Sequence, residues 1–182
     1  METKLKNEDG FTLIEILIAL IVIGIMAALA ITGYSNMRSA AITGGIVNNV
    51  QKFETIAEQY TAMNSGSFSG ISAQALQQDG LLPKGWIANS NEAEPPNQAS
   101  VSAYYINTGA LGLSEAYDVG FAGNGNSITD SMVHTICNDF ANKIDGFGYN
   151  GTVIAIQTGG TDCNAIPSDN NPITGIFTLG FE

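Results

Sequence analysis

The sequence is short of positive charge. Six of its 182 residues are Lys or Arg, against 17 Asp or Glu, and the formal net charge is −11. A chain this acidic repels nucleic-acid phosphates and anionic lipid head groups on average. Only a local basic patch would reverse this repulsion, and the basic residues beyond Gly10 are scattered: Arg38, Lys52, Lys84 and Lys143. We therefore expect no direct binding of nucleic acid.

The residue patterns of common catalytic and metal centres are also missing. No P-loop, HExxH, GxSxG or multi-cysteine zinc pattern occurs. The sole histidine, His134, lies one helical turn before Cys137, a spacing that would suit a reactive Cys–His pair. A histidine on a helix surface is the favoured interpretation. We predict no enzyme activity and no cofactor.

An acidic loop near the C-terminus is the one place that offers oxygen ligands suited to Ca²⁺. It contains Asp162, Asp169, Asn170 and Asn171. Their spacing matches no calcium-binding loop, so solvated loop residues are favoured over a metal site.

Proline is absent before Pro83, and the N-terminal part contains one long apolar run. From Phe11 to Ile31 this run would be about 31 Å long as a helix, enough to cross a bilayer core of about 30 Å. It carries one charge, Glu15, which would cost roughly 2.5–3.5 kcal/mol at the centre of a membrane span and less near its edge. An ionisable residue in such a segment indicates a functional contact.

Glu15 has no cationic partner nearby, because no Lys or Arg lies between Lys6 and Arg38. If the chain were cut after Gly10, the new α-amino group of Phe11 would be a cation in the same apolar layer. The helix keeps this amine away from Glu15 of its own chain. A neighbouring copy, shifted along the helix axis, can supply it.

The residues from Gly10 to Glu15 read GFTLIE and precede the apolar run. This pattern resembles the class III signal of type IV prepilins and pseudopilins. The resemblance implies that prepilin peptidase, a membrane aspartic protease, cuts after Gly10 and methylates the new N-terminus at Phe11, and that Glu15 is the assembly carboxylate. The leader departs from the family pattern, because Glu8 and Asp9 stand where a basic residue is usual.

On this resemblance the chain has three parts. They are a cleaved leader, residues 1–10, a transmembrane and assembly segment, residues 11–34, and a periplasmic or extracellular head, residues 35–182. Two alternatives compete for the N-terminal segment: a secretory signal peptide cut after the small residues of 27–30, and an uncleaved membrane anchor. Neither explains Glu15 or the position of Gly10.

The helix is predicted to continue to about Asn64, because apolar residues recur at steps of three and four. They are Ile42, Ile46, Val50, Phe53, Ala57, Tyr60 and Met63. Glycines such as the pair Gly44-Gly45 weaken this helix by up to about 1 kcal/mol each relative to alanine. They favour either close helix packing or local melting during assembly.

Beyond this helix the sequence predicts two more helices and four strands. The predicted helices are 72–78 and 128–143, and the predicted strands are 103–106, 117–121, 152–157 and 175–181. Residues 88–100 are predicted to form a polar loop and 123–126 a turn, and Trp86 is predicted to be partly buried. This order resembles the α+β pilin fold, in which a long helical spine carries a small antiparallel sheet.

Cys137 and Cys163 would both lie in the part that faces the periplasm, where a disulfide is the expected state. Such a bond would contribute about 3.5 kcal/mol in the chain-entropy model. One cysteine inside a helix and one between the last two strands resemble the type IVb pilins. The short leader and the N-terminal Phe11 resemble type IVa.

The resemblance implies a type IV pilin that polymerises with copies of itself into an extracellular pilus for adhesion, motility, DNA uptake or conjugation. Its precursor would lie in the inner membrane, where it would meet prepilin peptidase and the assembly machinery. The alternatives are a type II secretion pseudopilin or a minor pilin, and a binding protein anchored by an uncleaved helix.

Overall fold

The computed structural model describes residues 10–96, 100–109, 116–149, 152–156, 162–173 and 175–181. The chain divides into two compact units, one that ends at Ser39 and one that begins at Ala40. Helix α1 (Leu13–Met63) belongs in part to each unit. The unit from Ala40 onward is called the head below. The predicted leader before Gly10 lies outside the described residues.

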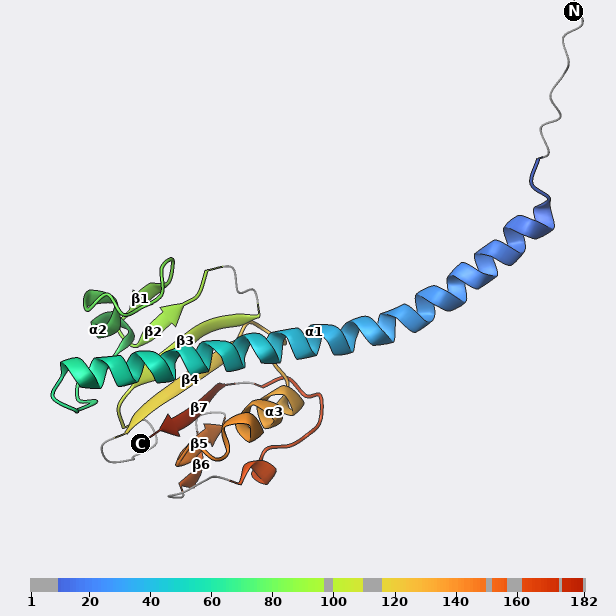
Figure 1. Cartoon of the computed structure of the whole chain (residues 1–182). Helices are drawn as coiled ribbons and strands as arrows, with labels where there is room; N and C mark the ends of the chain where they lie inside the picture. Colours follow the sequence, from blue (N-terminus) through green and yellow to red (C-terminus); the bar gives the residue numbers. More distant parts are fainter. Residues whose placement is uncertain are drawn as a thin grey trace, which may run out of the picture. The chain divides into compact units, whose positions relative to one another are not determined.

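The head combines helices with a single sheet (Figure 1). Besides the C-terminal half of α1, its described helices are α2 (Ala73–Gln78), α3 (Asp130–Phe140) and the 3₁₀ helix η1 (Cys163–Ala165). Its described strands are β1 (Ile87–Asn89), β2 (Glu92–Glu94), β3 (Val101–Asn107), β4 (Tyr117–Gly123), β5 (Gly146–Tyr149), β6 (Thr152–Ile156) and β7 (Ile176–Phe181).

The sheet is antiparallel throughout the described residues, with the strand order β1-β2-β3-β4-β7-β5-β6. The last strand, β7, lies inside the sheet, where it pairs with β4 on one side and β5 on the other. Strand β7 therefore joins the β1–β4 part of the sheet to the β5–β6 part. The α+β class and the four predicted strands are confirmed, except that Gln157 lies outside the described residues.

Helix α1 buries one stripe of its C-terminal half against the sheet, as the sequence predicts. Val50, Phe53 and Ala57 are at most 1% exposed. Met63, predicted to belong to the same stripe, is instead 60% exposed. It is the last residue of the helix, and the chain turns away just after it at Ser65, which has a positive φ of 57°.

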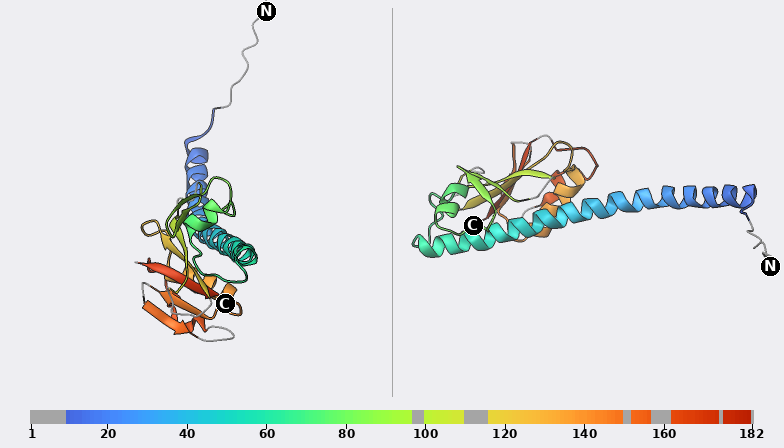
Figure 2. Two further views of the ribbon diagram at one scale, coloured as in Figure 1. Left: turned by 90° about the vertical axis from the view of Figure 1, so that its left-hand side faces the viewer. Right: turned by 90° about the horizontal axis from the view of Figure 1, so that it is seen from above.

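Aromatic side chains attach α1 and α3 to the same face of the sheet. Phe53 of α1 contacts Trp86 and Tyr104 at ring-centroid distances of 5.4 and 5.8 Å. Phe140 of α3 contacts Phe181 of β7 at 6.0 Å. Further ring contacts cross this face from β3 through β4 to β7, and Figure 2 shows the C-terminal half of α1 lying along one side of the sheet. Trp86 is half-buried in this cluster, as predicted.

The prediction of a polar loop over residues 88–100 is wrong, because β1 and β2 form a hairpin there. Asn89 pairs with Glu92, which leaves a two-residue turn that begins at Ser90 with a positive φ of 49°. Hairpin turns usually place glycine or asparagine at such a position. The strands are short, and Asn, Glu and Ala have low β propensity, so no local pattern predicts these strands.

Strand β5 has no counterpart among the predicted strands. Its sequence, Gly-Phe-Gly-Tyr, is half glycine, which is typical of a loop. Pairing with β7 on one side and β6 on the other supplies backbone hydrogen bonds, which hold this segment as a strand despite its low β propensity. Phe147 provides the apolar contact, with its ring centroid 6.0 Å from that of Phe177.

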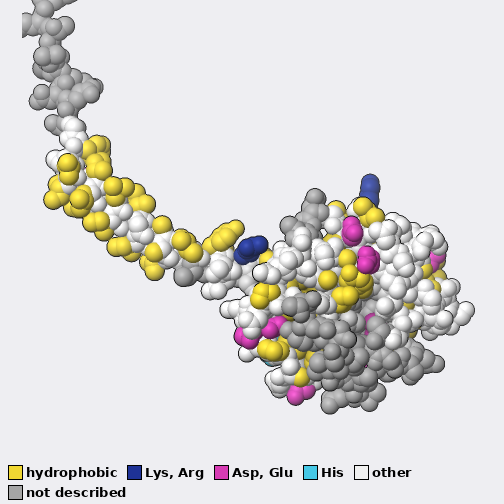
Figure 3. All heavy atoms as spheres, turned by 180° about the vertical axis from the view of Figure 1, so that it is seen from behind, with side chains coloured by type: hydrophobic (Ala, Val, Ile, Leu, Met, Phe, Trp, Pro, Cys, Tyr) yellow, Lys and Arg dark blue, Asp and Glu magenta, His cyan; other side chains and the backbone are white. Residues whose placement is uncertain are grey.

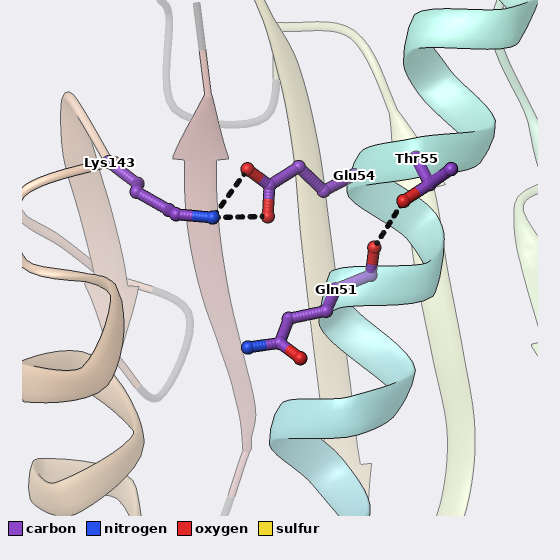
Figure 4. A network of polar contacts seen from close by, with 4 residues as sticks. All are labelled: Gln51, Glu54, Thr55 and Lys143. Carbon is purple, nitrogen blue, oxygen red and sulfur yellow. Dashed lines mark hydrogen bonds and ion pairs between the residues drawn. The ribbon is translucent and has the colours of Figure 1, made fainter.

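An ion pair joins the segment after α3 to the helical spine (Figure 4). Lys143 Nζ donates to both carboxylate oxygens of Glu54, at 2.8 and 3.0 Å. The side chains are 52% and 24% exposed, so water screens the pair and its contribution to stability is below about 1 kcal/mol. The ion pair shows which side of α1 faces α3.

Tyr117 of β4 is buried beneath the spine at 3% exposure and stacks on Phe181 with a centroid distance of 5.3 Å. Burial raises the pKa of its hydroxyl, and the negative charges of Glu54 and Glu58 raise it further. The folded head therefore holds the Tyr117 proton more tightly than the unfolded chain does.

Replacement of Tyr117 by Phe should make the head less sensitive to alkali. An unfolded tyrosine loses its proton near pH ~10, whereas folded Tyr117 keeps it, so the wild-type free energy of unfolding falls as the pH rises above about 10. Tyr117→Phe retains the stacked ring and removes this contribution. Urea unfolding at about pH 8 and about pH 11 measures both proteins. An equal loss of stability in the two proteins would contradict the assignment.

Candidate assembly site

The N-terminal unit exposes almost all of its apolar side chains. Phe11 is 82% and Leu13 is 84% exposed, and Figure 3 shows hydrophobic side chains covering this part of the chain. Helix α1 contains a stretch long and apolar enough to cross a membrane, and none of that stretch is buried. An α-helix that is apolar on all sides needs a cover of lipid or of other protein, so this unit fits a membrane-anchored precursor.

Gly10 and Phe11 lie before the first residue of α1, which begins at Leu13. The peptide bond that joins them is therefore outside the helix. A protease needs an extended backbone at the bond that it cuts, so this location suits the predicted cleavage point.

Thr12 and Glu15 form a capping box at the start of α1. The Thr12 backbone N–H donates to Glu15 Oε2 at 3.0 Å, and the Thr12 hydroxyl donates to the same oxygen at 2.9 Å. In return the Glu15 backbone N–H donates to Thr12 Oγ1 at 3.3 Å. The carboxylate also lies at the helix N-terminus, where the helix dipole favours negative charge.

Both contacts from Thr12 reach the same carboxylate oxygen of Glu15. Within the described residues the other oxygen, Oε1, has no hydrogen bond, and Glu15 forms no ion pair. The carboxylate is thus partly satisfied by its own helix and still has an oxygen that can accept from a donor of another molecule. The capping role of Thr12 was not predicted, although the T-x-x-E spacing is the signature of a capping box.

The predicted disulfide is present between Cys137 and Cys163. Their Cα atoms are 5.8 Å apart and both residues are buried, at 0% and 2% exposure. The bond links the buried face of α3 to η1. These cysteines belong to the head, whereas Gly10, Phe11 and Glu15 belong to the N-terminal unit, so the predicted residues form two separate sites.

His134 does not form a reactive pair with Cys137, because the cysteine sulfur is in the disulfide. Its Nδ1 is 3.2 Å from Nδ2 of Asn138, one turn further along α3. The alternative of a Cys–His site is therefore wrong, and the histidine is a residue of the helix surface.

The acidic loop holds its carboxylates in local turns. Asp162 accepts from the backbone N–H of Asn164 at 3.0 Å, and Asp169 accepts from the backbone N–H and the side chain of Asn171 at 3.1 and 2.8 Å. Asn170 is exposed. Among the residues that the structure describes, no three His, Cys, Asp or Glu side chains come together in a way that suits a metal ion.

Residues 5–31 match the prokaryotic N-terminal methylation motif. This is the prepilin type of motif, a signal for processing by prepilin peptidase and for assembly into multi-subunit filaments. No match was found among the curated proteins or among the solved structures. The chain thus joins a prepilin-type N-terminus to an α+β head that is consistent with the pilin fold, which points to a structural, pilin-like protein.

Loss of the disulfide should destabilise the head without preventing membrane insertion. Replacement of both Cys137 and Cys163 by Ser should lower the free energy of unfolding by about 3.5 kcal/mol. Urea unfolding measures this change, and the wild-type protein with reductant is the matched control, because it should lose as much stability as the double variant. Two titratable thiols in the wild-type head under non-reducing conditions would refute the assignment.

Proposed function

We propose that this chain is a type IV pilin, a subunit that polymerises with copies of itself into an extracellular pilus. The observation that carries the proposal is a combination of four features within one short segment. They are the glycine at position 10, an exposed Phe11, a Glu15 that is hydrogen-bonded in a capping box, and an apolar helix with no protein covering it. A soluble enzyme or a soluble binding protein has no use for an exposed apolar helix of this kind. Adhesion, motility, DNA uptake and conjugation are the activities that such a filament serves.

The proposed pathway begins in the inner membrane. The precursor lies there with its apolar helix in the lipid, and prepilin peptidase cuts after Gly10 and methylates the amine of Phe11. The inner-membrane assembly machinery then extracts the mature subunit. In the filament the apolar helices cover one another, so contacts with lipid are exchanged for contacts with identical helices.

Glu15 fixes the axial register of neighbouring subunits in this proposal. Its Oε1 accepts from the Phe11 amine of the next copy, and the opposite charges attract strongly because the surroundings exclude water. The capping box with Thr12 lowers the cost of holding the carboxylate in lipid until that amine arrives. A subunit without this carboxylate would still pack, but nothing would select one register over another.

The alternative within the same family of signals is a type II secretion pseudopilin or a minor pilin. A pseudopilin is often smaller and carries calcium in place of a C-terminal disulfide. The bond between Cys137 and Cys163 and the turn-bound carboxylates of Asp162 and Asp169 favour a pilin.

Gly10→Val should block processing, because a β-branched side chain does not fit where a protease accommodates the backbone beside glycine. Wild-type protein should have the mass of a chain that begins at Phe11 with one additional methyl group, whereas the variant should keep its leader. Mass spectrometry of the mature subunit measures both. A wild-type N-terminus at Met1 or after Ala30 would disprove the prepilin processing.

Glu15→Leu should enter the membrane at least as well as the wild type, since it removes the carboxylate that costs free energy there. It should nevertheless form no filaments when expressed alone, because the attraction that sets the register is lost. The membrane fraction and the yield of sheared filaments are the two measurements.

Glu15→Asp is the graded control for this experiment. It keeps the charge on a shorter arm that reaches the neighbouring amine less well, so its filament yield should lie between those of wild type and Glu15→Leu. A normal filament yield from Glu15→Leu would show that Glu15 is not the assembly contact, and would favour an anchored protein.

A further inference from the structure

Two exposed side chains follow the point where the apolar run of α1 ends. The run ends at Ile31, and Tyr34 and Arg38 lie further along the same helix. Residues four apart lie one above the other on one face of an α-helix, so this tyrosine and arginine form one small surface, called the border pair. Tyr34 is 70% exposed, and Arg38 is exposed as well. Both belong to the compact unit that contains the run and ends at Ser39.

Arg38 is the sole arginine of the chain and the sole basic residue between Gly10 and Ser39. It forms no ion pair within the part of the chain that the structure describes. Positive residues beside a membrane span usually gather on its cytoplasmic side, whereas the proposed orientation puts Arg38 on the periplasmic side. The orientation of the span therefore does not account for this charge.

The length of the helix brings the border pair to a membrane surface. From Leu13 to Tyr34 the helix rises about 32 Å at 1.5 Å per residue, against a bilayer core of about 30 Å. A helix that begins at one surface therefore has Tyr34 among the head groups of the other. Tyrosine is enriched in that layer, because its ring is apolar and its hydroxyl is polar. Arg38 follows one turn later, and helix side chains tilt towards the helix N-terminus, which directs a long side chain back to the head groups.

We propose that the border pair anchors the helix at the membrane surface, with the Arg38 guanidinium bound to a phospholipid phosphate and Tyr34 among the head groups. A planar guanidinium donates two parallel hydrogen bonds to a phosphate. This anchor fixes the depth of the span, and with it the depth of the bond between Gly10 and Phe11 at the opposite surface. The inference rests on a membrane-anchored chain and not on filament formation, so it goes beyond the pilin function.

The continuity of α1 selects lipid as the occupant. The apolar run and the border pair belong to one uninterrupted helix, so where lipid covers the run, head groups surround the residues that follow it. Phosphate is the anionic group of that layer, and the guanidinium is the side-chain group whose shape matches it. The acidic head repels the same layer on average, so an attraction to lipid phosphate has to come from a local cation such as Arg38.

Solid-state NMR on the full-length chain in phosphatidylglycerol bilayers tests the contact directly. With isotopically labelled arginine the chain has a single guanidinium signal, that of Arg38, and in phosphate-free buffer the lipid supplies all the phosphorus. Recoupling to phosphorus should cause a loss of this signal, because a bound phosphate lies in direct contact with the guanidinium. A signal that lipid phosphorus leaves unchanged would favour a carboxylate of a second copy as the partner and would overturn the proposal.

The matched control moves the single arginine into the head. The variant Arg38→Lys with Lys52→Arg has the same net charge and again one labelled guanidinium, but position 52 belongs to the head. Its signal should survive phosphorus recoupling. An equal loss at both positions would show that lipid contacts any arginine of the chain and would overturn the specific anchor.

The depth of the span is measured with single cysteines and a maleimide that does not cross membranes. The two native cysteines are joined in the disulfide, so an introduced cysteine is the thiol that reacts. Asn36→Cys, beside the border pair, should react at least ~10-fold faster than Ala28→Cys, which lies in the hydrocarbon layer. In the double variant Tyr34→Ala with Arg38→Gln this ratio should fall at least ~3-fold, because the residues that fix the depth are gone.

These substitutions lie in the N-terminal unit, outside the packed core of the head. An unchanged ratio in the double variant would show that the apolar run alone sets the depth and would overturn the anchor. Neither measurement requires filaments. A chain that contacts lipid through Arg38 and forms no filaments would overturn the pilin function and leave the anchor standing, whereas filaments from a chain without this contact would do the reverse.

Discussion

One helix has to satisfy two different surroundings, and the rest of the structure follows from that requirement. Up to Ser39 the large apolar side chains of α1 are exposed, whereas from Ala40 onward one stripe is buried under the sheet. The backbone is helical in both parts, so the difference lies in the side chains. Apolar residues on all sides require lipid or other helices as a cover, and apolar residues on one stripe require a single packed face. The head supplies that face through Phe53 and its aromatic neighbours, and it leaves the first part available to other molecules.

Two opposing requirements also meet at a single side chain, that of Glu15. A carboxylate without hydrogen bonds is costly in an apolar layer, whereas one with all its hydrogen bonds satisfied has nothing left to bind a neighbour. The capping box resolves this, because Thr12 satisfies Oε2 and leaves Oε1 without a hydrogen bond in the described residues. The local start of the helix and the proposed contact between subunits therefore use different oxygens of one group.

The sequence predicts the elements whose periodicity is long or whose composition is distinctive. The spine, α3 with its buried Cys137 and the strands rich in aromatic and β-branched residues are confirmed, since those patterns are local. The β1–β2 hairpin and β5 are not predicted, because pairing with distant strands stabilises them despite low β propensity. The ion pair of Lys143 with Glu54 depends on a contact across the fold, which no local pattern reveals. The capping role of Thr12 could have been predicted from the sequence, since its spacing to Glu15 is a known capping signature.

The disulfide restrains the segment that follows Asp162, and it also stabilises the head. The ring contacts between α1, the sheet and α3 do not pass through η1. The bond between Cys137 and Cys163 attaches to α3 the segment that begins with Asp162. This segment includes irregular chain, and its acids Asp162 and Asp169 are exposed. Backbone hydrogen bonds from the first turn of α3 to Asp169 and Asn171 hold the other end of that segment. Ile166 and Ile173 of the same segment are buried in the hydrophobic core of the head, at 3% and 6% exposure. The disulfide therefore adds to packing and hydrogen bonds that already hold this segment in place.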